Sequence, residues 1–116
     1  MKTLTLIVPC YNEQDVLPLF YDETSKMIAG IADEYAAEIL FVDDGSSDKT
    51  LSIIKDLAVR DPAVKYISFS RNFGKEAAML AGMEYSVKSD FTGILDADLQ
   101  HSPDLIPEML KYTDKE

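Results

Sequence analysis

Four short apolar segments, separated by segments with helical periodicity, constrain the fold of this sequence most strongly. They span residues 4–8, 38–42, 64–69 and 91–95. The first two show almost no alternation of apolar and polar side chains, which is typical of strands covered on both faces. The sequence therefore predicts four strands, at least two of them fully buried.

Helices are predicted between these strands. Apolar residues recur at helical spacing in residues 15–31 and again from Leu51 to Ala58. Residues 75–87 are rich in small side chains, which favours close packing against a sheet. A last helix is predicted to begin near residue 102, where a serine precedes a proline.

The alternation of strands and helices predicts an α/β domain. It indicates a Rossmann-like, mostly parallel four-stranded sheet with helices on both faces, formed by a single domain over residues 1–116. In such sheets, ligands bind beyond the carboxyl ends of the strands. The residues that follow each strand are therefore the candidates for a functional site.

Polar side chains follow all four predicted strands. They are Tyr11, Asn12 and Glu13 after the first strand, Asp43 and Asp44 after the second, Arg71 and Lys75 after the third, and Asp96, Asp98 and Gln100 after the fourth. Because the carboxyl ends of parallel strands meet at one edge of a sheet, these four groups predict one shared site.

Asp96 and Asp98 end the fourth apolar segment at positions i and i+2. On extended backbone this spacing points both carboxylates to the same side, where a hard divalent cation would offset their repulsion and leave room for phosphates. Gln100 adds a neutral oxygen at the same spacing. We interpret these three residues as ligands of Mg²⁺ or Mn²⁺, although an isolated Asp-x-Asp is also typical of a solvated acidic turn.

The other polar residues each have a functional and a structural interpretation. Tyr11 stacks on a nucleobase or is a half-buried loop aromatic, and Asp44 accepts from a base N–H or forms an Asx turn. Glu13 binds a ribose hydroxyl or caps the first helix. Arg71 and Lys75 meet a phosphate at a helix N-terminus or are solvated surface charges.

Three residues near these groups are interpreted as structural or peripheral. Asp43 is the structural member of its pair, since adjacent residues at a strand end cannot both face one ligand. His101 is a surface residue or a neighbour of the metal ligands, because oxygen ligands suit magnesium and manganese better. Cys10, the single cysteine, is a small apolar filler; it excludes an internal disulfide and fits a reducing compartment.

Composition excludes several classes of protein. A net charge of −10, from 11 basic and 21 acidic residues, disfavours nucleic-acid binding by bulk electrostatics. No segment approaches the ~20 apolar residues of a membrane span. The apolar run that Pro9 ends is too short for the core of a signal peptide. We therefore expect a soluble cytoplasmic chain with no nucleic-acid partner and no membrane segment.

Four motifs together resemble a known family. They are VPCYNE at residues 8–13, VDDGSSD at 42–48, SRNFGK at 70–75 and DADLQHSP at 96–103. In this order, the chain resembles from residue 4 to about 110 the nucleotide-sugar half of the family-two inverting glycosyltransferases of the GT-A fold. Within that family it is most similar to the polyprenyl-phosphate glycosyltransferases, the relatives of dolichol-phosphate mannose synthase and bactoprenol glucosyltransferase.

The resemblance implies a set of site residues. The nucleoside pocket would be lined by Pro9, Tyr11, Glu13, Val42 and Asp44. Asp96, Asp98 and Gln100 would hold Mg²⁺ or Mn²⁺ against the diphosphate, with Ala97 beside the ribose or sugar. Asp96 and Asp98 are thus the predicted catalytic residues, and Lys75 is the candidate for contact with the donor phosphates.

The implied reaction is an in-line displacement at the anomeric carbon, with inversion. A hexose would pass from UDP-glucose or GDP-mannose to an undecaprenyl or dolichyl phosphate, while the metal neutralises charge on the departing nucleoside diphosphate. An ionised lipid phosphate has less need of a general base than a sugar hydroxyl. The identity of the donor's nucleobase stays open, because Asp44 can accept from an N–H of either uracil or guanine.

Enzymes of this family are longer than this chain. We expect the acceptor-binding segment and the C-terminal membrane helices of a longer parent to follow residue 116, with the reaction on the cytoplasmic face of the membrane. By itself, the chain is expected to bind donor and metal weakly and not to turn over.

Three other classes of protein are alternatives to this one. A magnesium-binding phosphoacceptor receiver is disfavoured because the acidic pair follows the second predicted strand and no lysine closes a fifth strand. A dinucleotide-binding domain is disfavoured because no G-x-G-x-x-G follows the first strand. A non-catalytic module with an exposed edge strand predicts homo-oligomers or aggregates, which light scattering would detect.

Overall fold

The computed structural model describes residues 1–98, 106–107 and 110. The strands are β1 (Lys2–Cys10), β2 (Tyr35–Asp43), β3 (Val64–Ser68) and β4 (Phe91–Ile94), and the helices are α1 (Leu17–Ile31), α2 (Thr50–Arg60), α3 (Lys75–Tyr85) and the 3₁₀ helix η1 (Ser86–Lys88). All strand pairs are parallel, in the order β3-β2-β1-β4. The predicted α/β class with a parallel four-stranded sheet is confirmed.

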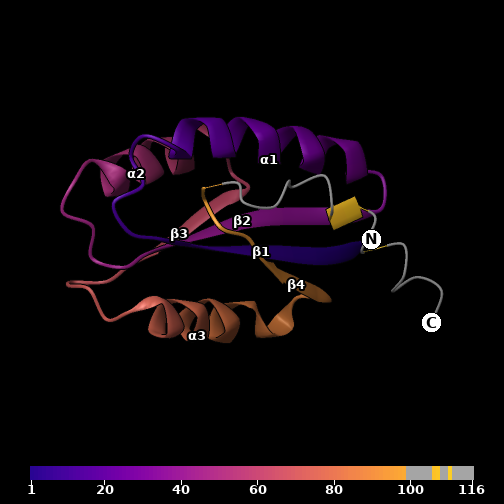
Figure 1. Cartoon of the computed structure of the whole chain (residues 1–116). Coiled ribbons are helices and arrows are strands. Elements are labelled where there is room, and N and C mark those ends of the chain that lie inside the picture. The colour runs from indigo at the N-terminus through magenta and orange to yellow at the C-terminus, as the bar shows by residue number, and fades with distance from the viewer. Residues whose placement is uncertain (99–105, 108–109, 111–116) are drawn as a thin grey trace.

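The sheet is covered on both faces, with α1 and α2 on one side and α3 on the other (Figure 1). Along β1, Leu6 and Val8 belong to the core beneath α1 and α2, whereas Ile7 belongs to the core beneath α3. The central strands therefore bury both sets of alternating side chains, which is why their sequences are continuously apolar.

Small residues allow α3 to lie close to the sheet, as predicted. Ala78 and Gly82 are its buried residues, and a Cβ atom built on Gly82 would lie 2.5 Å from Cγ2 of Ile7. The larger Leu80 and Met83 are instead 63% and 45% exposed. The packing face of α3 is thus formed by its smallest side chains.

Several element boundaries differ from the predicted ones. The second strand begins at Tyr35 rather than at residue 38, because its pairing with β1 starts at Lys2↔Tyr35. The first helix begins at Leu17 rather than near residue 15, because the backbone first turns at Glu13, whose carbonyl accepts the amides of Val16 and Leu17.

The C-terminal part of the chain is described only in part. Of the predicted last helix, residues 106, 107 and 110 are described, and they are helical. Ile106 and Leu110 belong to the core beneath α1 and α2. Among the described residues, no helix has the length and apolar character needed to cross a bilayer.

A matched pair of glycine substitutions tests the close approach of α3. Gly82→Ala is expected to lower the free energy of unfolding by about 1–3 kcal/mol, because the new methyl group displaces the buried Ile7. Gly30→Ala in α1, where a Cβ atom meets nothing within 4 Å, should raise it by about 0.5 kcal/mol. Urea denaturation measures both, and equal stability of the two variants would contradict the packing described for α3.

Candidate functional site

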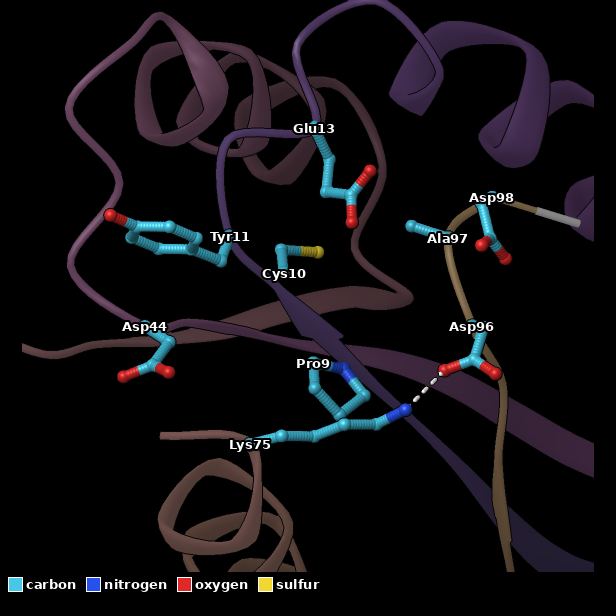
Figure 2. Close-up of a pocket in the computed structure, with 9 residues that line it drawn as sticks. All are labelled: Pro9, Cys10, Tyr11, Glu13, Asp44, Lys75, Asp96, Ala97 and Asp98. Atoms are coloured by element: carbon cyan, nitrogen blue, oxygen red, sulfur yellow. Dashed lines mark hydrogen bonds and ion pairs between the residues drawn. The ribbon is translucent and has the colours of Figure 1, made fainter. Parts of the chain in front are cut away.

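One pocket of about 210 Å³ lies where β1, β2 and β4 end (Figure 2). Its lining residues are Pro9, Cys10, Tyr11, Glu13, Asp44, Lys75, Asp96, Ala97 and Asp98. They come from the last two residues of β1, from the segments that follow β1, β2 and β4, and from the first residue of α3. The structure thus brings together residues from all four polar groups that the sequence places after the strands.

Asn12 ties the loop after β1 to the loop after β2. Its φ is +53°, in the left-handed region that asparagine tolerates better than most residues. Its Oδ1 accepts the backbone amide of Ser47 at 2.9 Å, and its own backbone amide donates to Oγ of Ser46 at 2.9 Å. These bonds fix the backbone between Tyr11 and Glu13, both of which line the pocket.

A second set of bonds connects the same loop to the start of α2. The amide of Glu13 donates to Oγ1 of Thr50 at 2.8 Å, and the amide of Thr50 donates to Oδ1 of Asp48 at 2.9 Å. Although desolvation raises the pKa of Asp48, hydrogen bonds from Thr50 and from the amide of Gln14 outweigh it and hold the pKa below its usual value. Asp48 stands just before the N-cap residue, Lys49, and accepts the first helical amide.

Asp44 ties the end of β2 to the start of α3. Its side chain is buried at 4% exposure, and its two oxygens accept the amides of Phe73 at 2.7 Å and Gly74 at 3.0 Å. Gly45 allows this approach, because with its φ of +72° a Cβ atom there would lie 2.2 Å from the carbonyl carbon of Arg71. The amides of Phe73 and Gly74, just before the first residue of α3, are therefore bonded within the protein.

The two remaining residues at the end of β2 do not contact the pocket. Asp43 is 1% exposed and accepts from the hydroxyl of Ser46, which agrees with its structural interpretation. Val42 is expected in the nucleoside pocket through the family resemblance. It is fully buried with Leu40 and Ala78 beneath α3, because the pleat of β2 points it away from the pocket.

The two predicted catalytic carboxylates line the same pocket. β4 ends at Ile94, and Ala97 and Asp98 lie in a turn, so the extended backbone assumed for the Asp-x-Asp spacing does not reach Asp98. Figure 2 nevertheless places Asp96 and Asp98 next to each other on the pocket wall. Gln100 and His101 lie outside the described residues.

Lys75 brings a positive charge into this acidic pocket. Its Nζ lies 2.9 Å from Oδ1 of Asp96, with side-chain exposures of 59% and 34% for the two residues. Figure 2 shows the lysine side chain running past Pro9 to reach Asp96. The other basic residue of that group, Arg71, stacks its guanidinium over the ring of Phe73 at 4.4 Å and is not part of the pocket lining.

The charges of the pocket act on Glu13. Burial raises the pKa of Glu13, and the negative charges of Asp98, Asp48 and Asp96 raise it further. Within the part of the chain that the structure describes, no three His, Cys, Asp or Glu side chains are close enough to hold a metal ion by themselves. A cation held by two of these carboxylates would need further ligands beside them.

Cys10 is a pocket residue that the sequence did not indicate. It is 2% exposed, lines the pocket and donates its thiol to the carbonyl of Val8 at 3.4 Å. Burial raises the pKa of this thiol well above its usual value, and the charges of Glu13 and Asp43 add to the effect. The raised pKa favours the protonated thiol, and a protonated thiol is a poor nucleophile.

Comparison with known proteins identifies the family. The sequence profile of Glycosyl transferase family 2 matches residues 5–116. The chain belongs to this family. The resemblance stated from the motifs is thereby confirmed, and the receiver and dinucleotide-binding alternatives are rejected.

Two relatives and one solved structure illustrate the similarity. The chain is 48% identical over 108 residues to CsbB of Bacillus subtilis (strain 168) and 42% identical over 108 residues to the bactoprenol glucosyl transferase of Shigella phage SfX. These matches cover 93% of this chain and 32% and 34% of the relatives, so the chain spans about a third of their length. The mannosyltransferase PcManGT from Pyrobaculum calidifontis, solved with GDP-Man and Mn²⁺, matches with a TM-score of 0.77 at 24% identity, covering 94% of this chain and 31% of that one. This likeness confirms the GT-A fold.

The electrostatic coupling of Glu13 to its neighbours predicts a shift that NMR can detect. In a carboxyl-detected NMR titration, Glu13 is expected to titrate above the ordinary glutamate range of about 4.3. Asp98→Asn should lower the titration midpoint of Glu13, because it removes the neighbouring carboxylate with the largest effect on the pKa of Glu13. Asp56→Asn, on the outer face of α2, is the matched control and should leave the midpoint unchanged. An Asp98→Asn variant with an unshifted Glu13 would contradict the described clustering of charge.

Proposed function

We propose that this chain is the donor-binding domain of a metal-dependent glycosyltransferase. The parent enzyme transfers a hexose from a nucleoside diphosphate sugar to a polyprenyl phosphate, with inversion at the anomeric carbon. The observation that carries this proposal is the pocket itself. In a family 2 chain, one edge of a parallel sheet gathers an aromatic ring, four carboxylates and a lysine around a single space.

The nucleoside is assigned to the end of the pocket that Tyr11 and Asp44 form. Figure 2 shows these two residues together, on the side of Pro9 away from Asp96 and Asp98. The ring of Tyr11 is 47% exposed and offers a face for base stacking. Oδ2 of Asp44 accepts the amide of Gly74 and Nδ2 of Asn72, whereas Oδ1 accepts the amide of Phe73 and retains a lone pair for a base N–H. Glu13 is assigned to the ribose hydroxyls.

The metal and the diphosphate are assigned to the opposite end. Asp96 already forms an ion pair with the ammonium of Lys75, and Asp98 lines the same space. The oxygens of these two carboxylates suit a hard cation. Magnesium and manganese are commonly held by one or two carboxylates together with substrate phosphates. We assign Asp96 and Asp98 as ligands of Mg²⁺ or Mn²⁺, with Ala97 beside the ribose or sugar, and Gln100 stays the predicted third ligand. The Mn²⁺ in the PcManGT structure supports this choice of metal.

The residues of the pocket then perform an in-line displacement. The acceptor phosphate oxygen bonds to the anomeric carbon as the bond from that carbon to the donor diphosphate breaks, and the electron pair leaves with the nucleoside diphosphate. A bound divalent cation would supply Lewis-acid stabilisation of that leaving group. Tyr11 and Glu13 hold the nucleoside, and Lys75 adds positive charge beside the diphosphate. Because the acceptor phosphate is already ionised, the pocket need not supply a general base.

The identities of donor and acceptor rest on the named relatives. The bactoprenol glucosyl transferase of Shigella phage SfX supports a polyprenyl phosphate acceptor and a glucosyl donor. As further parts of the proposal, we take a UDP-hexose as the donor and assign the domain to the cytoplasmic face of the membrane. We assign no acceptor contact to the residues that line this pocket.

Calorimetric titration tests the donor site. The chain, titrated with UDP-glucose and with GDP-mannose in the presence of Mn²⁺, is expected to bind UDP-glucose and to lose that binding with excess chelator. Asp96→Asn and Asp98→Asn should each weaken metal-dependent binding about tenfold or more, since each removes a charged ligand. Asp56→Asn, an equal change of charge on the exposed face of α2, should bind like the unaltered chain.

The possible results of this titration separate the parts of the proposal. Binding that persists in chelator would contradict the metal role. Binding of GDP-mannose but not of UDP-glucose would support the donor-binding function and show that the nucleobase is guanine rather than uracil. Absence of binding to either donor, by this chain and by the full-length parent, would contradict the function itself.

A further inference from the structure

Lys75 is the one cationic side chain among the described residues that line the pocket. Four carboxylates share the lining with it: Glu13, Asp44, Asp96 and Asp98. The diphosphate of a nucleotide sugar would bring further negative charge into the same space. The ammonium of Lys75 is therefore the one positive charge that the described lining offers to these anions.

The start of the Lys75 side chain is fixed by the backbone around it. Lys75 is the first residue of α3, and Asp44 bonds the amides of both preceding residues, Phe73 and Gly74. Gly74, with φ of +102°, turns the chain into the helix. Movement of the ammonium is thus left to the four-carbon stem of the lysine, which extends past Pro9 (Figure 2).

The ion pair at the end of this stem is suited to exchange. At 59% and 34% exposure, Lys75 and Asp96 form a pair that solvent screens, and such pairs are weak. The lysine ammonium is a compact charge on a flexible stem, and it can reach a second anion without moving the backbone. A divalent cation that Asp96 and Asp98 both ligate would displace it, provided that the ammonium finds a new partner.

We propose that Lys75 is an internal counter-ion that neutralises Asp96 until the donor arrives. When the donor diphosphate enters, the ammonium moves to a phosphate oxygen and leaves Asp96 to the metal ion. This inference rests on the proposed function and adds a coupling to it. The metal alone must displace Lys75 and leave it unpaired, whereas the donor alone meets an acidic pocket, so each binds better in the presence of the other.

Such coupling is reciprocal, because the donor must strengthen metal binding by the same factor as the metal strengthens donor binding. It also assigns two opposite effects to one side chain. Lys75 weakens metal binding when no nucleotide is present and strengthens nucleotide binding when the metal is present. A lysine that only contacted phosphate would show the second effect without the first.

Manganese binding to Lys75 variants tests the proposal. Free Mn²⁺ is measured by EPR during titration of the chain, without nucleotide and with saturating UDP or GDP. In the unaltered chain, the nucleotide should tighten Mn²⁺ binding by about fivefold or more. In Lys75→Met, which keeps the stem and removes the charge, Mn²⁺ alone should bind several-fold tighter, and the effect of the nucleotide should fall towards none.

Two further variants control this measurement. Lys75→Arg keeps the positive charge and should preserve most of the coupling. Lys55→Met makes the same change of charge on the exposed face of α2 and should behave like the unaltered chain. Lys75 is mostly exposed and outside both cores, so the loss of its charge leaves the fold intact.

The outcomes separate this inference from the proposed function. If Lys75→Met binds Mn²⁺ no more tightly than the unaltered chain without nucleotide, or keeps the full coupling, the counter-ion role is overturned and the donor site stands. If neither the unaltered chain nor the full-length parent binds Mn²⁺ or nucleotide, both are overturned.

Discussion

The parallel pairing of β1 with β2 is the constraint on which the pocket depends. Its register, from Lys2↔Tyr35 to Cys10↔Asp43, makes both strands end at the same level. The two loops that follow can therefore bond through Asn12, while the amide of Leu95 bonds to the carbonyl of Ile7 and brings the segment after β4 to the other side of β1. Residues distant in sequence thus line one space around Pro9.

This arrangement concentrates negative charge, and the fold contains specific means of tolerating it. Asp43 and Asp44 are nearly fully buried, and both accept hydrogen bonds from the loops that they hold. For Glu13, burial raises the pKa of the carboxyl, and repulsion from its acidic neighbours raises it further. The ammonium of Lys75 offsets part of that charge at Asp96. A site built this way favours cations and poorly tolerates anions unless a cation accompanies them.

Sequence patterns anticipated the fold better than the site. The apolar strands could be predicted because burial on both faces requires continuously apolar segments. Their parallel pairing followed from the alternation of strands and helices, and the close packing of α3 followed from its small residues. The burial of Val42 beneath α3 and the hydrogen bonds that Asp44 accepts from the start of α3 could not be predicted, since they depend on residues far apart in sequence. The turn at Asp98 was not indicated by the Asp-x-Asp spacing. The ion pair of Lys75 with Asp96 joins positions 21 residues apart, and no local pattern indicates it.

Paramagnetic broadening by Mn²⁺ tests most directly whether this edge of the sheet holds a metal and a diphosphate. The amide NMR signals of the chain would be recorded with a nucleoside diphosphate and substoichiometric Mn²⁺. The account predicts selective loss of signals near Asp96, Asp98 and Lys75, while signals at the opposite end of the sheet, such as Glu34 and Ala63, stay sharp. Broadening spread evenly over the acidic surface, or centred away from the pocket, would contradict it.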